Sequence, residues 1–370
     1  MPPLTQPTID PNTFLSLVPS SHQSPLDDDP HPPQPLTTTT TTTTITIFFI
    51  PGNPGLIAYY HAFLALLSSA LSGPSVVDGR RASRFRIYGA SLGGFEVDEE
   101  IDFVEGRLRS VMSNGSSDHD GWKQPPTATT TATAAKPQVI LVGHSVGAYI
   151  AMEILRRHRE GRREDDDGYD AAFAFDIVGA VLLFPAVVDI AKSTAGRRLS
   201  WLLYLIPELA RVTGLLAKAL TWALPAAVLR SLVRLVMGFP PENAVETTLA
   251  FLGSRRGVRQ ALHMAADEMR EITADRWSDD IWGTSSSTSS MSSSAKKPPS
   301  KLVFYFGRND HWVAERTRDE IIATRGRRAK GGGPKMVVCE DGVPHAFCIR
   351  HSDVMARKVA RFIMDIVTGD

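Results

Sequence analysis

A single serine between two glycines, in residues 141–149 (LVGHSVGAY), constrains the fold of this chain more than any other feature. Gly143 and Gly147 each stand two residues from Ser145, and an apolar stretch leads into them. This spacing is typical of a sharp turn from a strand into a helix, in which the serine adopts a strained backbone conformation. A Cβ atom at either glycine position would collide with the turn. The pattern therefore predicts that the Ser145 hydroxyl stands clear of the sheet, where a base can reach it.

The segments around this turn alternate between strand and helix patterns. The expected strands are rich in β-branched and aromatic residues and cover 44–50, 84–91, 137–143, 176–185, 301–307 and 335–341. Helical spacing of apolar residues marks 57–71, 97–112, 148–158, 314–324 and 352–367. This order predicts an α/β fold, with a mostly parallel central sheet and helices on both faces. In such a sheet, the loops at the carboxyl ends of the strands carry the functional groups.

The composition is that of a globular protein with no charge bias towards nucleic acid. Of the 370 residues 43% are hydrophobic, and 40 basic residues balance 40 acidic ones. The two cysteines, Cys339 and Cys348, are too few for a disulfide framework, which favours a reducing compartment such as the cytosol. The first residues, MPPLTQPTIDPNTF, lack the basic and apolar regions of a secretory signal.

Segments of biased composition divide the chain into five predicted parts. The two halves of the core are separated by a large insertion, and each junction is polar or of low complexity. The parts are a disordered Pro- and Thr-rich lead-in (1–43), the first half of the core with a low-complexity loop (44–190, loop 113–137), an apolar helical insertion (191–282), a serine-rich loop (283–300) and the second half of the core (301–370).

Two further residues complete a catalytic arrangement with Ser145. A serine hydroxyl needs a base to remove its proton, and the base needs an acid to fix its tautomer. Asp310 follows the expected strand 301–307 in FGRNDHWV, and His345 lies in the Gly- and Pro-containing loop EDGVPHAFC before the last helix. Their chain order, Ser, Asp, His, is the order of an α/β-hydrolase. The pattern predicts acyl transfer, for which we expect neither a cofactor nor a metal ion.

Other residues compete with this assignment. Asp189, in FPAVVDIAKS after the expected strand 176–185, is an alternative acid because some hydrolases place the acid there. Asp341 is close to His345 in sequence and is interpreted as a turn residue. Three further histidines are interpreted as solvent-exposed, loop or ordinary core residues: His263, His311 and His351.

The loop IPGNPG (50–55) is the expected source of an oxyanion hole. An acyl transfer needs hydrogen-bond donors for the developing oxyanion, and glycines let the backbone approach the substrate carbonyl. Pro54 has no N–H, so the N–H of Asn53 is the best donor in this loop. The N–H of Val146, directly after the nucleophile, is the expected second donor. The alternative interpretation of the loop is a tight turn that caps the following helix.

Together these motifs resemble the lipid droplet-associated hydrolase family of the α/β-hydrolase superfamily. The resemblance runs from about residue 44 to the C-terminus and rests on FFIPGNPGLIAYYHAFLALL, VGHSVGAY, LLFPAVVDIAKSTAGR, GRNDHWV and VPHAFC. Its most specific part is the PGNPG…YY stretch, which replaces the usual His-Gly start. The resemblance implies Ser145 as nucleophile, Asp310 as acid and His345 as base. It also implies association with lipid droplets and the endoplasmic reticulum, and hydrolysis of sterol esters or other neutral lipid esters.

Residues 199–239 are the most apolar part of the insertion, in the interval where hydrolases commonly build a lid. No uncharged apolar run there reaches the ~18 residues that a spanning helix needs, and Pro207 and Pro225 interrupt the segment. We therefore expect a peripheral or monotopic attachment to a membrane surface rather than a spanning one.

The charges of this segment are predicted to form one edge of a wide apolar face. On a helical projection Glu208, Arg211 and Lys218 fall within an arc of roughly 80°. Arg230 and Arg234 lie one turn apart on the next segment. An apolar face with a basic edge is typical of a helix in a phospholipid monolayer, whereas a lid packed on the core is the alternative. The apolar residues expected to contact a membrane or form the lid are Trp201, Leu205 and Trp222.

Two functions of different classes are therefore predicted. The first is a serine esterase that acts on neutral lipid or sterol esters at the cytosolic face of lipid droplets and the endoplasmic reticulum. The second is a protein that organises the droplet surface and whose hydrolase fold is catalytically weak or idle. The complete triad favours the first function, and both functions require a phospholipid surface as partner.

Overall fold

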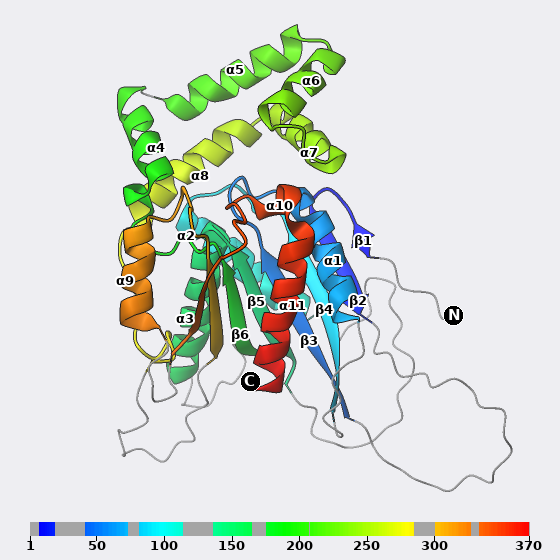
Figure 1. Cartoon of the computed structure of the whole chain (residues 1–370), viewed down its shortest axis with the longest axis vertical. Coiled ribbons are helices and arrows are strands. Elements are labelled where there is room, and N and C mark those ends of the chain that lie inside the picture. Colours follow the sequence, from blue (N-terminus) through cyan, green and yellow to red (C-terminus); the bar gives the residue numbers. More distant parts are fainter. Residues whose placement is uncertain are drawn as a thin grey trace, which may run out of the picture.

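An eight-stranded sheet forms the centre of the protein (Figure 1). The computed structural model describes residues 7–18, 41–72, 81–113, 136–164, 175–206, 208–284, 300–326 and 333–369. The strand order in the sheet is β1-β2-β4-β3-β5-β6-β7-β8. The strands are β1 (Thr8–Ile9), β2 (Thr13–Val18), β3 (Thr41–Ile50), β4 (Arg81–Ala90), β5 (Gln138–His144), β6 (Asp176–Leu183), β7 (Lys301–Phe306) and β8 (Lys335–Val338).

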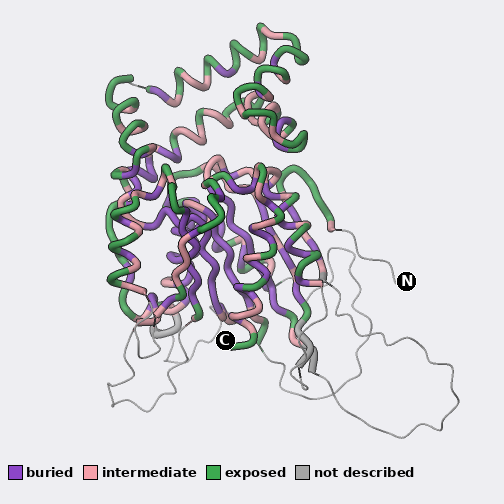
Figure 2. The backbone as a smooth tube through the Cα atoms, in the orientation of Figure 1, coloured by how far each residue is buried: buried purple, intermediate pink, exposed green. Residues whose placement is uncertain are grey.

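The six strands from β4 to β8 in this order are parallel, as the alternation of strand and helix patterns predicted. Strands β5, β6 and β7 are almost wholly apolar after their first residue, as expected for strands that helices cover on both faces. Successive side chains of β3 enter different cores: Phe48 packs into one apolar cluster and Phe49 into the other. Figure 2 shows this buried sheet between more exposed helices.

The helices form a layer on each face of the sheet. On one face, α1 (His61–Leu71), which follows the short helix η1 (Ile57–Tyr60), packs against α11 (Ser352–Thr368). On the other face, α2 (Val97–Ser113) packs against α3 (Val146–Glu164), and α9 (Glu315–Arg325) adds Ile321 to the same core. The short helix α10 (Phe347–Arg350) lies between β8 and α11. The predicted α/β-hydrolase arrangement of sheet and helices is confirmed.

The predicted disordered lead-in over residues 1–43 is wrong for two of its parts. Strand β2 pairs antiparallel with β4, with Phe14 opposite Gly89, and β1 pairs antiparallel with β2. The beginning of β3, which includes the end of the Thr tract, pairs with β4 from Thr41 onwards. The many proline and threonine residues in this part of the sequence suggested disorder and hid the six-residue strand β2. Such a short strand is stabilised by its tertiary partners rather than by its own propensity. Residues 19–40 lie outside the described residues.

In the described part of the interval between β6 and β7, five α-helices lie over the carboxyl ends of the strands (Figure 1). We call them the helical insertion. They follow a short helix, η4 (Ile190–Lys192), and fall within the predicted boundaries 191–282. They are α4 (Thr194–Leu205), α5 (Leu209–Ala223), α6 (Ala226–Val236), α7 (Glu242–Gly253) and α8 (Gly257–Glu271). The predicted loops over 113–137 and 283–300 lie almost entirely outside the described residues.

The helical insertion is bent at its predicted breaks. Helix α6 begins directly after Pro225, which stands at its N-cap, and Pro207 lies outside the described residues. Helices α4 and α5 are bent by 92° relative to each other. Within the described ranges, no single helix is long and apolar enough to cross a membrane, and α4 with α5 meets that requirement only as this bent pair, by length and composition.

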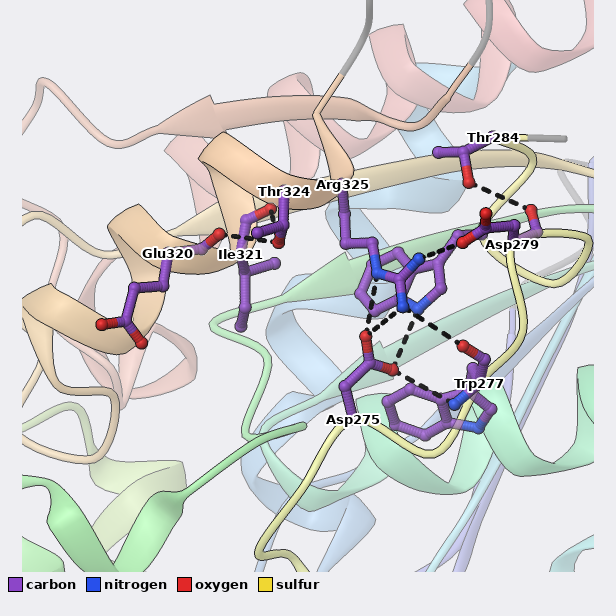
Figure 3. A network of polar contacts seen from close by, with 9 residues as sticks. Asp275, Trp277, Asp279, Thr284, Glu320, Ile321, Thr324 and Arg325 are labelled. Atoms are coloured by element: carbon purple, nitrogen blue, oxygen red, sulfur yellow. Dashed lines mark hydrogen bonds and ion pairs between the residues drawn. The ribbon is translucent and has the colours of Figure 1, made fainter. Parts of the chain in front are cut away.

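The chain returns from the insertion to the core through a segment that Arg325 of α9 anchors (Figure 3). The Arg325 guanidinium forms an ion pair with Asp275 at 2.7 Å and a second with Asp279. It also lies 5.4 Å from the ring centroid of Trp282. The Nε1–H of Trp282 donates to Asp275 at 3.0 Å, and that of Trp277 donates to Glu153 of α3 at 2.8 Å. These contacts fix the base of the insertion against α3 and α9.

The pairing of β2 with the sheet gives a prediction about stability. Phe14 is fully buried against α1, so Phe14→Ala should lower the free energy of unfolding by about 3–5 kcal/mol. The matched control is Ile9→Ala on β1, where the side chain is 47% exposed and the expected loss is under about 1 kcal/mol. Urea denaturation followed by circular dichroism measures both. Equal effects of the two substitutions would show that β2 does not belong to the folded sheet.

Candidate active site

Ser145 occupies a sharp turn between the end of β5 and the start of α3. Its φ angle is 56°, in the left-handed region that non-glycine residues rarely adopt. The Ser145 N–H donates to the carbonyl of Leu183 at 3.0 Å, which ties the turn to β6. A Cβ at Gly143 would overlap the backbone of Gly147, and one at Gly147 would overlap the backbone of Ile50. The predicted need for glycine at both positions is therefore confirmed.

Ser145, His345 and Asp310 form a continuous chain of hydrogen bonds. The Nε2 atom of His345 lies 3.0 Å from Oγ of Ser145. The Nδ1 atom of His345 lies 2.9 and 2.8 Å from the two carboxylate oxygens of Asp310. The Asp310 side chain is 1% exposed, and it also accepts a hydrogen bond from the N–H of Trp312 at 2.8 Å. A carboxylate held in this way fixes Nδ1 as the protonated nitrogen and leaves Nε2 free to accept the serine proton.

The fold brings these three residues together from distant parts of the chain. Ser145 follows β5, Asp310 follows β7 and His345 follows β8. These strands lie in one parallel stretch of the sheet, so their carboxyl ends meet at the same edge. The helical insertion lies over this edge (Figure 1).

The competing residues have other partners. Asp189 precedes η4 in a left-handed conformation and pairs with Lys192 at 2.8 Å. Asp341 pairs with Lys358 at 2.8 Å, and this ammonium group lowers the pKa of the Asp341 carboxyl. Within the described ranges, Asp310 is the one carboxylate hydrogen-bonded to His345.

The other three histidines considered lie away from the serine. His263 is an exposed residue of α8 and lies 3.4 Å from Glu96. His351 joins α10 to α11, and His311 is exposed while its carbonyl accepts a hydrogen bond from the N–H of Ala195. Each of these positions is structural or solvent-exposed, as the sequence predicted.

Two residues that the sequence did not single out form hydrogen bonds that hold the backbone of His345. His144 is buried, and its Nε2 lies 3.0 Å from the carbonyl oxygen of His345. A carbonyl can only accept, so Nε2 of His144 carries the hydrogen and Nδ1 accepts from the hydroxyl of Tyr60 at 2.7 Å. The hydroxyl of Tyr60 in turn accepts from the N–H of Gly52 at 3.2 Å. The loop after β3 is thus linked to the backbone of His345 through two buried side chains.

The protonation of His144 follows from its surroundings. Burial, and secondarily the proximity of His345, lower the pKa of His144 well below its ordinary value. His144 therefore stays neutral at physiological pH and holds a single tautomer. Phe184 and Phe347 stack on each other and pack edge-on against the His144 ring, which keeps this region apolar. In the sequence, His144 could have been noticed as the histidine within GHSVG, and Tyr60 as the second tyrosine of PGNPG…YY.

The loop of residues 50–55 lies directly against Ser145. A Cβ at Gly52 would stand 2.8 Å from Cβ of Ser145, so the backbone of this loop comes as close to the serine as a glycine allows. The side chain of Asn53 points to the helical insertion, where its Nδ2 donates to Ala261 at 2.9 Å and to Glu268 at 2.8 Å. The backbone N–H groups of Asn53 and Val146 remain the predicted oxyanion donors.

Glu268 of α8 is the second unexpected group at this loop. Burial raises the pKa of Glu268 to about 7, although the hydrogen bond from Asn53 opposes the shift. The loop that borders the nucleophile is therefore tied to the insertion through a carboxyl group that titrates near neutral pH. A second hydrogen bond between the core and the insertion joins Tyr59 of η1 to Thr248 of α7. The hydroxyl oxygens of these two residues lie 2.8 Å apart.

The arrangement can activate a serine hydroxyl for nucleophilic attack at an acyl carbon. In the part of the chain that the structure describes, no group of three His, Cys, Asp or Glu side chains could hold a metal ion. The class of the protein follows from three features: the sharp turn at Ser145, the chain order Ser145, Asp310, His345, and the parallel sheet. Together they define a serine-type site on an α/β-hydrolase fold.

Comparison with known proteins agrees with this class and gives the family. The family model for lipid-droplet associated hydrolases matches residues 43–348, and the chain belongs to this family. A lipid droplet-associated hydrolase of Gallus gallus is 26% identical over 330 residues, which cover 86% of this chain and 84% of the relative. The Homo sapiens protein of the same name is 24% identical over 334 residues, with the same shares covered. The resemblance seen in the sequence is confirmed.

Solved structures confirm the fold. A peroxisomal α/β-hydrolase of Saccharomyces cerevisiae superposes with a TM-score of 0.51 at 11% identity, over 90% of this chain and 79% of its own. A haloalkane dehalogenase of Bradyrhizobium elkani gives a TM-score of 0.50 at 12% identity, over 99% of both chains. At such identities the likeness concerns the fold alone.

The hydrogen bonds of His345 predict which carboxylate supports the serine. Asp310→Asn should slow the labelling of Ser145 by a fluorophosphonate probe by ~10³-fold or more, because an amide stabilises the wrong tautomer of His345. Asp189→Asn is the matched control and should change the rate less than about threefold, since Asp189 pairs with Lys192. Time courses of in-gel fluorescence measure both rates. A larger loss in Asp189→Asn would move the acid to the loop after β6.

Proposed function

We propose that this chain is a serine hydrolase of carboxylic esters that acts on neutral lipid or sterol esters at lipid droplets. The observation that carries the proposal is the unbroken hydrogen-bond chain from Asp310 through His345 to Ser145. Its distances are those of a nucleophile and base that can exchange a proton without rearrangement.

The proposed reaction is a two-step acyl transfer. Oγ of Ser145 attacks the ester carbonyl while Nε2 of His345 takes its proton, and the buried carboxylate of Asp310 stabilises the imidazolium. The N–H groups of Asn53 and Val146 donate to the oxyanion. His345 then returns the proton to the leaving alcohol, which leaves an acyl group on Ser145. Water, deprotonated by His345, then attacks the acyl carbon; the carboxylic acid leaves, and His345 returns the proton to Oγ of Ser145.

The proposed site of action is a phospholipid surface, at lipid droplets or at the cytosolic face of the endoplasmic reticulum. The helical insertion exposes large apolar side chains that water solvates poorly: Trp201 is 61%, Leu205 49% and Trp222 90% exposed (Figure 2 shows the exposed helices). Burial of ~200 Å² of such surface would contribute about 5 kcal/mol at about 25 cal/mol per Å². The names of the curated relatives, which associate them with lipid droplets, also support this location.

A second candidate function is organisation of the droplet surface by a catalytically weak or idle hydrolase fold. The exposed apolar side chains of α4, α5 and α6 favour it, because surface attachment needs them whether or not the serine reacts. The hydrogen-bonded triad favours the enzyme. Catalysis and attachment are therefore tested separately.

Catalysis is tested by removal of the nucleophile and of the base. Ser145→Ala and His345→Ala should each lower hydrolysis of a short-chain p-nitrophenyl ester by several orders of magnitude, because each removes one member of a unit that acts together. Ser69→Ala on α1 is the matched control, since this exposed hydroxyl donates to the carbonyl of Ala65 within its own helix. Turnover by the purified variants, with melting curves, is the measurement. Unchanged turnover in either triad variant would exclude this mechanism.

Attachment is tested by polar substitutions on the helical insertion. Trp201→Gln, Leu205→Gln and Trp222→Gln together should release the protein from phospholipid-coated triglyceride droplets, because they replace two exposed tryptophans and an exposed leucine of the insertion by polar side chains. Labelling of Ser145 by the fluorophosphonate should persist, since the turn belongs to the core. Ile9→Gln with Leu66→Gln is the control, as both residues are exposed and lie outside the insertion. Retention of the triple variant on droplets, measured by flotation, would assign attachment to another surface.

A further inference from the structure

A pocket in the helical insertion lies apart from the triad. It is formed between α5 and the turn that joins α7 to α8, and it has a volume of about 330 Å³. Helices α5 and α8 approach closely at its edge, where a Cβ at Gly214 would stand 3.3 Å from Cβ of Arg259. The pocket is therefore part of the packed structure of the insertion.

The pocket is lined by five cations and by no acidic residue: Arg211, Lys218, Arg255, Arg256 and Arg259. Arg211 pairs with Glu208 at 2.8 Å. The other four make no ion pair with any residue that the structure describes. Arg256 and Arg259 also border a neighbouring groove that contains Glu96 and Glu99, whereas Lys218 and Arg255 do not border that groove.

Two basic residues of the insertion that lie outside the pocket, both on α6, are neutralised. The predicted basic edge included Arg230 and Arg234, but both pair with Glu242 of α7, and Arg230 pairs also with Glu246. Glu208 stands before the first residue of α5 in a left-handed conformation, and α4 is bent away from α5. The single helical projection that grouped Glu208 with Lys218 therefore applies only to the residues within α5. Among the described residues of the insertion, the cations without an ion pair are therefore four residues of the pocket together with Arg197 and Arg198 of α4.

The chemistry of the pocket fits a phosphate group. Unpaired cations at close range repel each other, and a bound anion relieves that repulsion. A guanidinium group can donate two parallel hydrogen bonds to two oxygens of one phosphate, and an ammonium group adds a compact positive charge. Helix α8 begins at Gly257 between Arg256 and Arg259, so its positive N-terminal end faces the same region.

The surroundings of the pocket indicate a lipid as the source of that phosphate. Leu215, Lys218 and Trp222 stand three and four residues apart on α5 and therefore share one face. Leu215 lines the pocket and is 66% exposed, and Trp222 is 90% exposed. An anionic headgroup held by Lys218 would leave its acyl chains beside these apolar side chains.

We propose that Lys218, Arg255, Arg256 and Arg259 form a binding pocket for the phosphate of an anionic phospholipid at the surface to which the insertion attaches. This assignment rests on the proposed attachment to a phospholipid surface. It does not rest on hydrolysis, because the pocket shares none of the triad residues.

Vesicle sedimentation in the Ser145→Ala background tests the pocket. Affinity for phosphatidylcholine vesicles measures apolar attachment, and the ratio of affinities with and without added phosphatidic acid measures the pocket. Lys218→Gln with Arg255→Gln should lower this ratio by about tenfold or more, because both cations contact the phosphate. Arg197→Gln with Arg198→Gln, two exposed cations of α4 outside the pocket, should lower it by less than about threefold.

Three results would overturn the assignment. An equal loss in both double variants would mean that diffuse positive charge, rather than a pocket, attracts the vesicles. An unchanged ratio in Lys218→Gln with Arg255→Gln would exclude the site. Inorganic phosphate that binds, by calorimetry, as tightly as the phosphatidic acid vesicles would assign the pocket to a soluble anion. Failure of attachment itself would appear as lost binding to phosphatidylcholine, which is read independently of the ratio.

Discussion

The close approach of two backbone segments, at the turn after β5 and at the end of β3, is the constraint on which the site depends. Gly147 passes so near the carbonyls of Ile50 and Pro51 that no side chain fits between them. This contact holds Ser145 in its left-handed conformation at the start of α3 and brings Gly52 against it. Ser145 and the loop that would supply the oxyanion donors are therefore positioned by the same close approach of the backbone.

The remaining contacts at the site hold the backbone of His345 and connect the loop of residues 50–55 to the insertion. Neutral His144 links the backbone of His345 to Tyr60, and Tyr60 is linked in turn to Gly52. All these hydrogen bonds join uncharged groups, which is favourable in apolar surroundings. On the other side of the loop, Asn53 joins Ala261 and Glu268 of α8. A shift of α8 would thus act on the loop next to Ser145, and the carboxyl of Glu268 makes this connection sensitive to pH near neutrality.

The sequence predicted the features that depend on local pattern and on chain order. The turn at Ser145, the parallel strands and the placement of Asp310 and His345 at strand ends follow from glycine spacing, apolar runs and loop positions. The sequence did not predict β2, because Phe14 is stabilised by a partner strand about 75 residues away, and short strands carry little signal of their own. Nor could it show that Glu242 neutralises Arg230 and Arg234, since ion pairs between helices depend on packing. The hydrogen bonds of His144 and Tyr60 likewise could not be predicted from the sequence, because they depend on the packing of segments that are distant in sequence.

An acyl-enzyme on Ser145 is the intermediate on which the proposed activity depends. The purified protein mixed with p-nitrophenyl butyrate, quenched in acid within the first turnover and digested, should yield the peptide around Ser145 with one butyryl group. Its mass spectrum should show the adduct at about one per active site if deacylation is the slower step, and the unmodified peptide in Ser145→Ala. Quenching at graded times separates formation of the adduct from its hydrolysis. Steady hydrolysis with the butyryl group on another residue would contradict the assignment of Ser145 as the nucleophile.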